Sequence, residues 1–158
     1  METCFMLNLL YTLALLVPLP FWALMILFPR QRLAQQAMES YLGALILGGM
    51  YTLTLFGALI SGIGRIPIDF GSPAGLAAML ADPAMALVIW LHVVAVDLAV
   101  GYWIYTDGLR RNKSTRLILV LTLFAAPLGL FIYFMNRLLE RAAEAAAQEG
   151  GQSSLIAQ

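Results

Sequence analysis

Two side chains that can transfer protons lie inside one long apolar stretch of the chain. His92 and Asp97 occur in the run IWLHVVAVDLAVGYWIYTDGL, which begins at Ile89. Imidazole and carboxyl groups are common general acids and bases in enzymes. An aspartate at the centre of a membrane helix costs about 2.5–3.5 kcal/mol on insertion scales, so it normally faces the bundle interior. Asp97 is therefore the first candidate for a catalytic acid, and in a low-dielectric setting we expect its carboxyl to be protonated.

The spacing of these residues predicts separate neighbours for them. At about 100° per residue, His92 and Asp97 lie about 140° apart around a helix, so they do not form a dyad. Gly101 follows Asp97 by one turn on the same face, and its missing side chain permits either close helix contact or a flat ligand. A packing role is the alternative for Asp97, with hydroxyls of adjacent helices as partners. His92 is equally consistent with a structural role and with a functional role.

The residue types give little support for a metal site or a cofactor site. The chain has one histidine and one cysteine, which cannot supply the three or four ligands of a zinc site. A haem held by His92 and one of the eight methionines is left open, although methionine in membrane helices usually serves packing. The formal net charge of zero gives no indication of a nucleic-acid partner. We predict no metal site and no cofactor.

The composition places these side chains in a membrane. Hydrophobic residues make up 61% of the 158 residues and charged residues 11%, against about 45–50% and about 25% in soluble domains. Four apolar segments reach the roughly 20 residues that cross a bilayer. We predict an all-α fold with four transmembrane helices in one domain over residues 1–141, and a polar, flexible tail over residues 142–158. The segments are Leu7–Phe28, Tyr41–Ser61, Ala84–Tyr105 and Leu117–Asn136.

The distribution of lysine and arginine predicts an orientation. The first and third connections of such a bundle hold six of these residues, and the opposite side holds three, Arg65, Arg137 and Arg141. The positive-inside rule then places both termini outside. In the second connection, SPAGLAAMLADP has Ser72 and Pro73 at its start, which predicts a short helix lying along the interface.

Several runs of the chain resemble a known family when they are taken together and in order. LYTLALLVPLPFWALMILFP, MES, GLAAML, W.HVVAVDL, IYTDGL and APLGL resemble the four-helix membrane proteins of the abscisic-acid-deficient-four-like family, the neoxanthin synthase type. The resemblance covers roughly Leu10 to Tyr133. The matching positions are Pro20, Phe21, Pro29, Met38, Glu39, Ser40, His92, Asp97, Tyr105, Asp107, Gly108, Arg116, Pro127 and Gly129.

The resemblance implies a ligand class and a reaction. Plant members of the family are implicated in converting the epoxycarotenoid violaxanthin into the allenic neoxanthin, so it implies a carotenoid or another isoprenoid lipid as ligand. It also implies an isomerisation without a redox cofactor. No plastid transit segment precedes the first helix, which predicts a bacterial inner (cytoplasmic) membrane protein. Two alternatives stay open: a carotenoid-binding protein without turnover, and a structural accessory subunit of a larger membrane complex. Homo-oligomerisation is also left open.

Epoxide opening toward an allene suggests roles for the candidate residues. It needs a proton delivered to the epoxide oxygen and a proton removed from a polyene carbon. Asp97 is expected to act as the acid, and His92 or Glu39 as the base. Aromatic rings are expected to stack on the polyene or hold its ring end. The expected ligand-binding residues are Phe21, Trp22, Tyr51, Trp90, Gly101, Trp103 and Tyr105.

Overall fold

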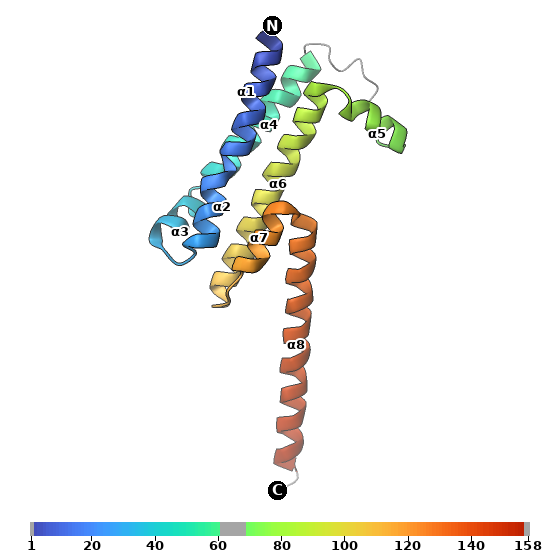
Figure 1. Ribbon diagram of the computed structural model, residues 1–158. Coiled ribbons are helices and arrows are strands. Elements are labelled where there is room, and N and C mark those ends of the chain that lie inside the picture. Colours follow the sequence, from blue (N-terminus) through green and yellow to red (C-terminus); the bar gives the residue numbers. More distant parts are fainter. Residues whose placement is uncertain (1, 61–68, 157–158) are drawn as a thin grey trace.

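The computed structural model describes residues 2–60 and 69–156, and within these ranges it contains α-helices and no strand. The all-α prediction is therefore confirmed. Figure 1 shows α1, α4 and α6 running side by side, with α5 set apart at one end and α8 extending past the other. The helices are α1 (Glu2–Leu16), α2 (Pro18–Leu27), α3 (Arg32–Glu39), α4 (Leu42–Ile60), α5 (Pro73–Leu80), α6 (Pro83–Arg110), α7 (Arg116–Phe124) and α8 (Ala126–Ile156).

Three helical stretches are long and apolar enough to cross a membrane: Cys4–Leu27, Arg32–Ile60 and Pro83–Arg110. The first contains both α1 and α2. Val17 joins these two helices and keeps right-handed helical dihedral angles (φ −58°, ψ −43°), because a proline at the first position of a helix has no N–H bond to lose. The chain is thus a membrane protein, built around three long apolar helical segments.

The fourth apolar segment, Leu117–Asn136, does not form one continuous helix. Helix α7 ends at Phe124, and Ala125 leaves the helical region with φ −157° and ψ 86° before α8 begins. Pro127 accounts for the break, since a proline inside a helix removes one hydrogen bond and clashes with the carbonyl four residues earlier. The prediction of a fourth single spanning helix is therefore replaced by a helical hairpin.

The two arms of this hairpin pack closely. Gly129 of α8 faces Thr122 of α7, and a Cβ atom on Gly129 would lie 2.0 Å from the Thr122 hydroxyl oxygen. Thr122 is fully buried and its hydroxyl donates to the Ile118 carbonyl at 2.7 Å. Because α8 runs back along the molecule, the start of α1 and the end of α8 lie at opposite ends of the structure (Figure 1). The side of a membrane on which each terminus lies stays a prediction.

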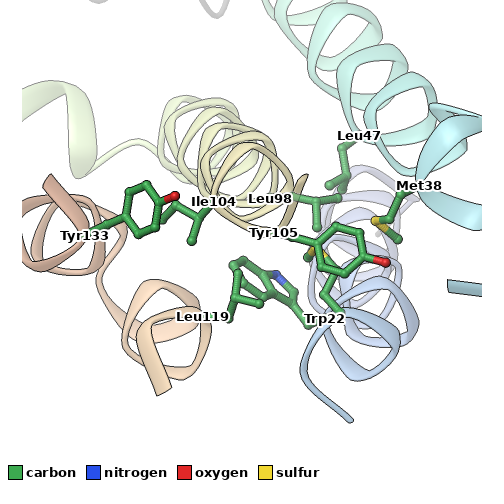
Figure 2. Close-up of a cluster of buried hydrophobic side chains, with 9 residues drawn as sticks. Trp22, Met38, Leu47, Leu98, Ile104, Tyr105, Leu119 and Tyr133 are labelled. Carbon is green, nitrogen blue, oxygen red and sulfur yellow. The ribbon is translucent and has the colours of Figure 1, made fainter. Parts of the chain in front are cut away.

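Helix α6 is the central element and supplies much of the core. Figure 2 shows side chains of α2, α3, α4, α7 and α8 converging on it. The Trp22 indole from α2 lies against Leu119 of α7. The largest buried cluster consists of Trp22, Met25, Met38, Leu47, Leu98, Ile104, Tyr105, Leu119 and Tyr133.

The short helix predicted in the second connection is confirmed as α5. The Ser72 hydroxyl accepts a hydrogen bond from the Gly75 amide at 3.0 Å, and Asp82 caps α6 by accepting from the Ala84 and Met85 amides. At the other end of the chain, the segment expected as a polar tail continues α8 in helical form as far as Ile156. Its flexibility stays a prediction.

Candidate functional site

An apolar cavity of about 430 Å³ lies between α1, α2, the middle of α6 and the end of α7. We call it the Asp97 cavity, because Asp97 is the one residue in its lining with a titratable side chain. Two tryptophans, Trp22 and Trp90, form part of its walls. Such a volume and composition are typical of small-molecule sites. The remaining lining residues are Ala14, Leu15, Pro18, Leu19, Val93, Val94, Leu123 and Phe124.

Asp97 lines this cavity and has no polar partner among the described residues. Within the described ranges, no residue donates a hydrogen bond to its carboxyl or forms an ion pair with it. The side chain is half-buried and lines the cavity. A carboxyl that only fixed helix packing would be bonded to hydroxyls of neighbouring helices, as buried polar groups usually are. Asp97 therefore lacks the partners that a purely structural carboxyl would have.

Trp22 occupies the space that Gly101 leaves on α6. A Cβ atom on Gly101 would lie 2.4 Å from Cη2 of the Trp22 ring, and Trp22 is only 3% exposed. Of the two sequence-based alternatives for Gly101, the structure therefore places a protein side chain rather than open space against the glycine. Gly101 shapes the cavity indirectly, by letting the indole reach its wall.

Trp90 lies about two turns before Asp97 on α6 and forms another part of the same cavity wall. Its ring contacts Tyr11 of α1, with centroids 6.3 Å apart. Trp90 is 37% exposed, so its ring can also meet a molecule that enters from the lipid. Trp22, Trp90 and Asp97 are thus the predicted site residues that the structure brings together.

The two residues expected as bases lie elsewhere. His92 is exposed and its ring faces Tyr51 of α4, with centroids 5.7 Å apart, so it points to a different neighbour from Asp97, as the helical spacing predicts. Glu39 is exposed at the end of α3. Neither His92 nor Glu39 lines the Asp97 cavity.

Three further aromatic residues that were predicted to bind the ligand lie outside the Asp97 cavity. The hydroxyl of Tyr105 donates to the Pro29 carbonyl at 2.7 Å and its side chain is buried. Trp103 packs edge-on against Tyr133 of α8 at 5.4 Å. Phe21 packs against Gly43 of α4. All three make contacts between different segments of the chain, and none lines the Asp97 cavity.

The cavity also contains residues that sequence reasoning missed. Leu123 and Phe124 reach it because α7 ends at Phe124 beside α6. The signal that could have found them is Pro127, which lies inside the fourth apolar segment and marks the break.

A second polar group of residues, the Asp107 cluster, joins the end of α6 to α8. It comprises Asp107, Arg111, Tyr133, Arg137 and Glu140. Arg137 Nη1 and the Tyr133 hydroxyl both donate to Asp107 Oδ2, the former at 2.6 Å. Arg111 donates to Glu140, and this hydrogen bond lowers the pKa of the Glu140 carboxyl. Each charged group in the cluster therefore has a partner, in contrast to Asp97.

Within residues 2–60 and 69–156, no three His, Cys, Asp or Glu side chains come together in a group that could hold a metal ion. The arrangement of the Asp97 cavity allows proton transfer by one carboxyl and stacking or edge contacts by two indoles.

The chain shares sequence similarity with known proteins. Residues 9–133 match the family model described as ABA DEFICIENT 4-like. Among curated proteins, the chain is 29% identical over 126 residues to Protein ABA DEFICIENT 4, chloroplastic, from Arabidopsis thaliana. The match covers 75% of this chain and 56% of the plant protein, so the chain spans little more than half of that relative's length. No solved structure matches.

Proposed function

Because the chain belongs to the ABA DEFICIENT 4-like family, we propose that it is a membrane protein whose Asp97 cavity holds one end of a carotenoid or related isoprenoid. The observation that carries the proposal is the Asp97 carboxyl, which has no polar partner among the described residues and lies in a cavity whose other lining residues are apolar or aromatic. The likeness to the plant protein supports the ligand class.

The dimensions of the cavity support an end-on arrangement of the ligand. Its volume of about 430 Å³ accommodates a ring with its substituents rather than a whole C40 chain. The polyene then runs along the exposed apolar sides of the helices, among the lipid tails. Trp22 and Trp90 provide flat surfaces against which the ring end packs.

The proposed reaction is an isomerisation of the epoxide end group to an allene. The Asp97 carboxyl gives its proton to the epoxide oxygen as the carbon–oxygen bond breaks, and a proton leaves the adjacent polyene carbon as the allene forms. The ring gains a hydroxyl group, the atoms balance, and no oxidant or reductant is consumed.

We assign the second proton transfer to Asp97 as well, because it is the titratable residue that lines the cavity. The epoxide oxygen and the carbon that loses a proton are separated by two bonds, so the two oxygens of one carboxyl can serve them in turn. The proton taken from carbon restores the acid. This replaces the sequence-based assignment of His92 or Glu39 as the base, since both lie outside the cavity.

The charge distribution supports a revised orientation. Arg137 and Glu140 of α8 contact Asp107 and Arg111 of α6, so the hairpin brings Arg137 and Arg141 to the same end as the six cations already counted. Arg65 lies outside the described residues. By the positive-inside rule, this end faces the compartment in which the chain is made. The N-terminus then lies on the far side and the C-terminus on the near side.

Ligand binding is tested first, with two matched substitutions on α6. Val93 lines the Asp97 cavity, whereas Val96 lines a different surface, and the two are 39% and 45% exposed. The protein is purified from a host that makes an epoxycarotenoid, and its pigment is extracted and identified. We expect Val93→Phe to reduce bound pigment several-fold and Val96→Phe to leave it unchanged. Colourless wild-type protein would remove the basis of the proposal.

Turnover is tested with the isosteric replacement of the acid. Asp97→Asn keeps the size of the side chain but cannot donate a carboxyl proton, so the protein should bind pigment while conversion drops by about 10²–10⁴-fold. His92→Gln and Glu39→Gln serve as controls and should retain conversion. Full activity of Asp97→Asn contradicts the assignment. Bound but unaltered pigment in the wild-type protein points to the alternative function, carotenoid binding without turnover.

A further inference from the structure

A second cavity, of about 330 Å³, lies at the end of the molecule where α2 and α6 finish and α7 begins. Three cations line it: Arg30 from the connection between α2 and α3, Lys113 from the connection between α6 and α7, and Arg116 at the start of α7. Among the described residues that line it, none is acidic. We call this cavity the basic pocket.

The structure holds Arg30 in place without neutralising it. Its Nη2 atom donates to Asn112 Oδ1 at 2.7 Å, and an amide carries no charge. Asn112 has a φ of 54°, the left-handed conformation that asparagine tolerates better than most residues. The Lys113 amide donates to the Gly108 carbonyl at 2.9 Å and closes the same turn. Two connections far apart in sequence are thereby fixed with their cations facing one cavity.

The nearby carboxylates do not neutralise all of the positive charge at the basic pocket. Lys113 lies 3.3 Å from Glu140, but Glu140 also accepts from Arg111. Asp107 is engaged by Arg137 and lies 4.0 Å from Arg111. Two carboxylates are therefore shared among three cations, and they do not contact Arg30 or Arg116. The field in the basic pocket stays positive, which favours an anion.

The remaining lining combines hydrogen-bond donors with an apolar wall. Gln31, Ser114 and Thr115 offer an amide and two hydroxyls, while Leu27, Phe28 and Leu109 are apolar. A cavity with cations at the end of membrane helices and an apolar side suits a phosphate group, because guanidinium groups bind its oxygens in pairs. Basic pockets between helices on this side of a membrane commonly hold lipid headgroups.

We propose that the basic pocket binds a phosphate group, with Arg30, Lys113 and Arg116 as its ligands. Two sources supply this chemistry at a membrane surface: the headgroup of an anionic phospholipid and free inorganic phosphate. The proposal is independent of the Asp97 cavity, since the two cavities share no lining residue.

The test compares two triple variants that remove the same charge. Arg30→Gln/Lys113→Gln/Arg116→Gln changes the basic pocket, and Arg32→Gln/Arg110→Gln/Arg141→Gln changes cations outside its lining. Binding of short-chain phosphatidylglycerol to the protein in an uncharged detergent is measured by native mass spectrometry. We expect affinity to fall at least tenfold in the first variant and less than threefold in the second. An equal loss in both variants would show diffuse attraction and overturn the proposal.

A titration with inorganic phosphate separates the two sources. Competition with phosphatidylglycerol at millimolar phosphate supports a site for the free ion, and lipid binding that resists phosphate supports a headgroup site. A wild-type protein that binds neither probe overturns the proposal.

A single substitution keeps the test decisive if the first triple variant does not fold. Ser114→Glu places a carboxylate in the exposed lining, and Ser114 makes no side-chain hydrogen bond within the described residues. It should weaken binding at least tenfold while the melting temperature stays near that of the wild type. Unchanged binding in this folded variant also overturns the proposal.

Discussion

Asp97 and Asp107 lie ten residues apart on α6, about 15 Å along its axis, and they have opposite surroundings. Asp97 faces an apolar cavity in which no described side chain bonds to it. Asp107 accepts hydrogen bonds from Tyr133 and Arg137 at the end of the helix. A carboxylate that holds two helices together has its partners inside the protein, whereas a carboxyl kept for a ligand does not. The comparison therefore separates a structural acid from a candidate functional acid on one helix.

The same substitution at the two aspartates should have opposite effects on stability. Asp107→Leu removes the partner of Arg137 and Tyr133 and should lower the free energy of unfolding by about 2–3 kcal/mol, as expected for hydrogen bonds to a charged group. Asp97→Leu removes an unpaired polar group from an apolar cavity and should leave stability unchanged or raise it. Thermal unfolding in detergent measures both.

A double variant sharpens the comparison. Arg137→Leu added to Asp107→Leu should recover part of the lost stability, because the second change removes the cation that the first left without a partner. If Asp97→Leu destabilised the protein as much as Asp107→Leu, the distinction between the two acids would fail.

A smaller effect on stability is expected from a substitution at Gly101, where the Asp97 cavity meets the core. Gly101→Ala places a methyl group 2.4 Å from the Trp22 ring, and such overpacking should cost about 1–3 kcal/mol. Gly48→Ala is the control, since a Cβ atom on Gly48 would have no atom within 4 Å. Pigment content, measured with the melting temperature, should fall in Gly101→Ala because the indole must shift. Equal melting temperatures in the two variants would argue against close Trp22 packing.

Removing one buried hydroxyl should have a more modest effect. Tyr105→Phe deletes the hydrogen bond to the Pro29 carbonyl, which measures 2.7 Å, and should lower stability by about 0.5–1.5 kcal/mol. Tyr11→Phe on the exposed side of α1 is the control and should have no effect. Because Tyr105 lies outside the Asp97 cavity, pigment binding should persist in the variant. A loss of pigment at unchanged stability would restore Tyr105 as a ligand-binding residue.

The smallest predicted effect is on the pH dependence of thermal stability. The hydrogen bond from Arg111 lowers the pKa of Glu140 from its ordinary value of 4.5, so the pair contributes stability that is fully present above pH 4.5. That contribution is lost as the pH falls through the lowered pKa. Below pH 4.5, wild-type melting temperature should therefore decrease more steeply than that of Glu140→Gln. Glu144→Gln, at an exposed position without an ion pair among the described residues, should follow the wild-type profile.

Local signals predicted the parts of the fold that depend on neighbouring residues. Ser72 before Pro73 predicted α5, and the structure has its hydroxyl as the cap. The spacing of His92 and Asp97 predicted different neighbours for the two, which the structure also has. These features follow from helix geometry and from hydrogen bonds within a few residues, so a single segment contains the information.

Features that depend on how segments meet were not predicted. Hydropathy alone made Leu117–Asn136 one span, because a count of apolar residues does not register the break at Pro127. That error also separated Arg137 from the end of α6, and so hid its pairing with Asp107. Gly101 was open to two interpretations because only the folded structure shows that Trp22 of α2 fills its space.

In the proposed orientation, the helical hairpin formed by α7 and α8 also simplifies how the chain enters its membrane. A hairpin that dips in and returns to its own side requires no passage of the residues that follow it. After α6 is inserted, the polar half of α8 can stay in the compartment where it is synthesised. In this arrangement the insertion machinery transfers only the N-terminal end and the segment between α4 and α6, which includes α5.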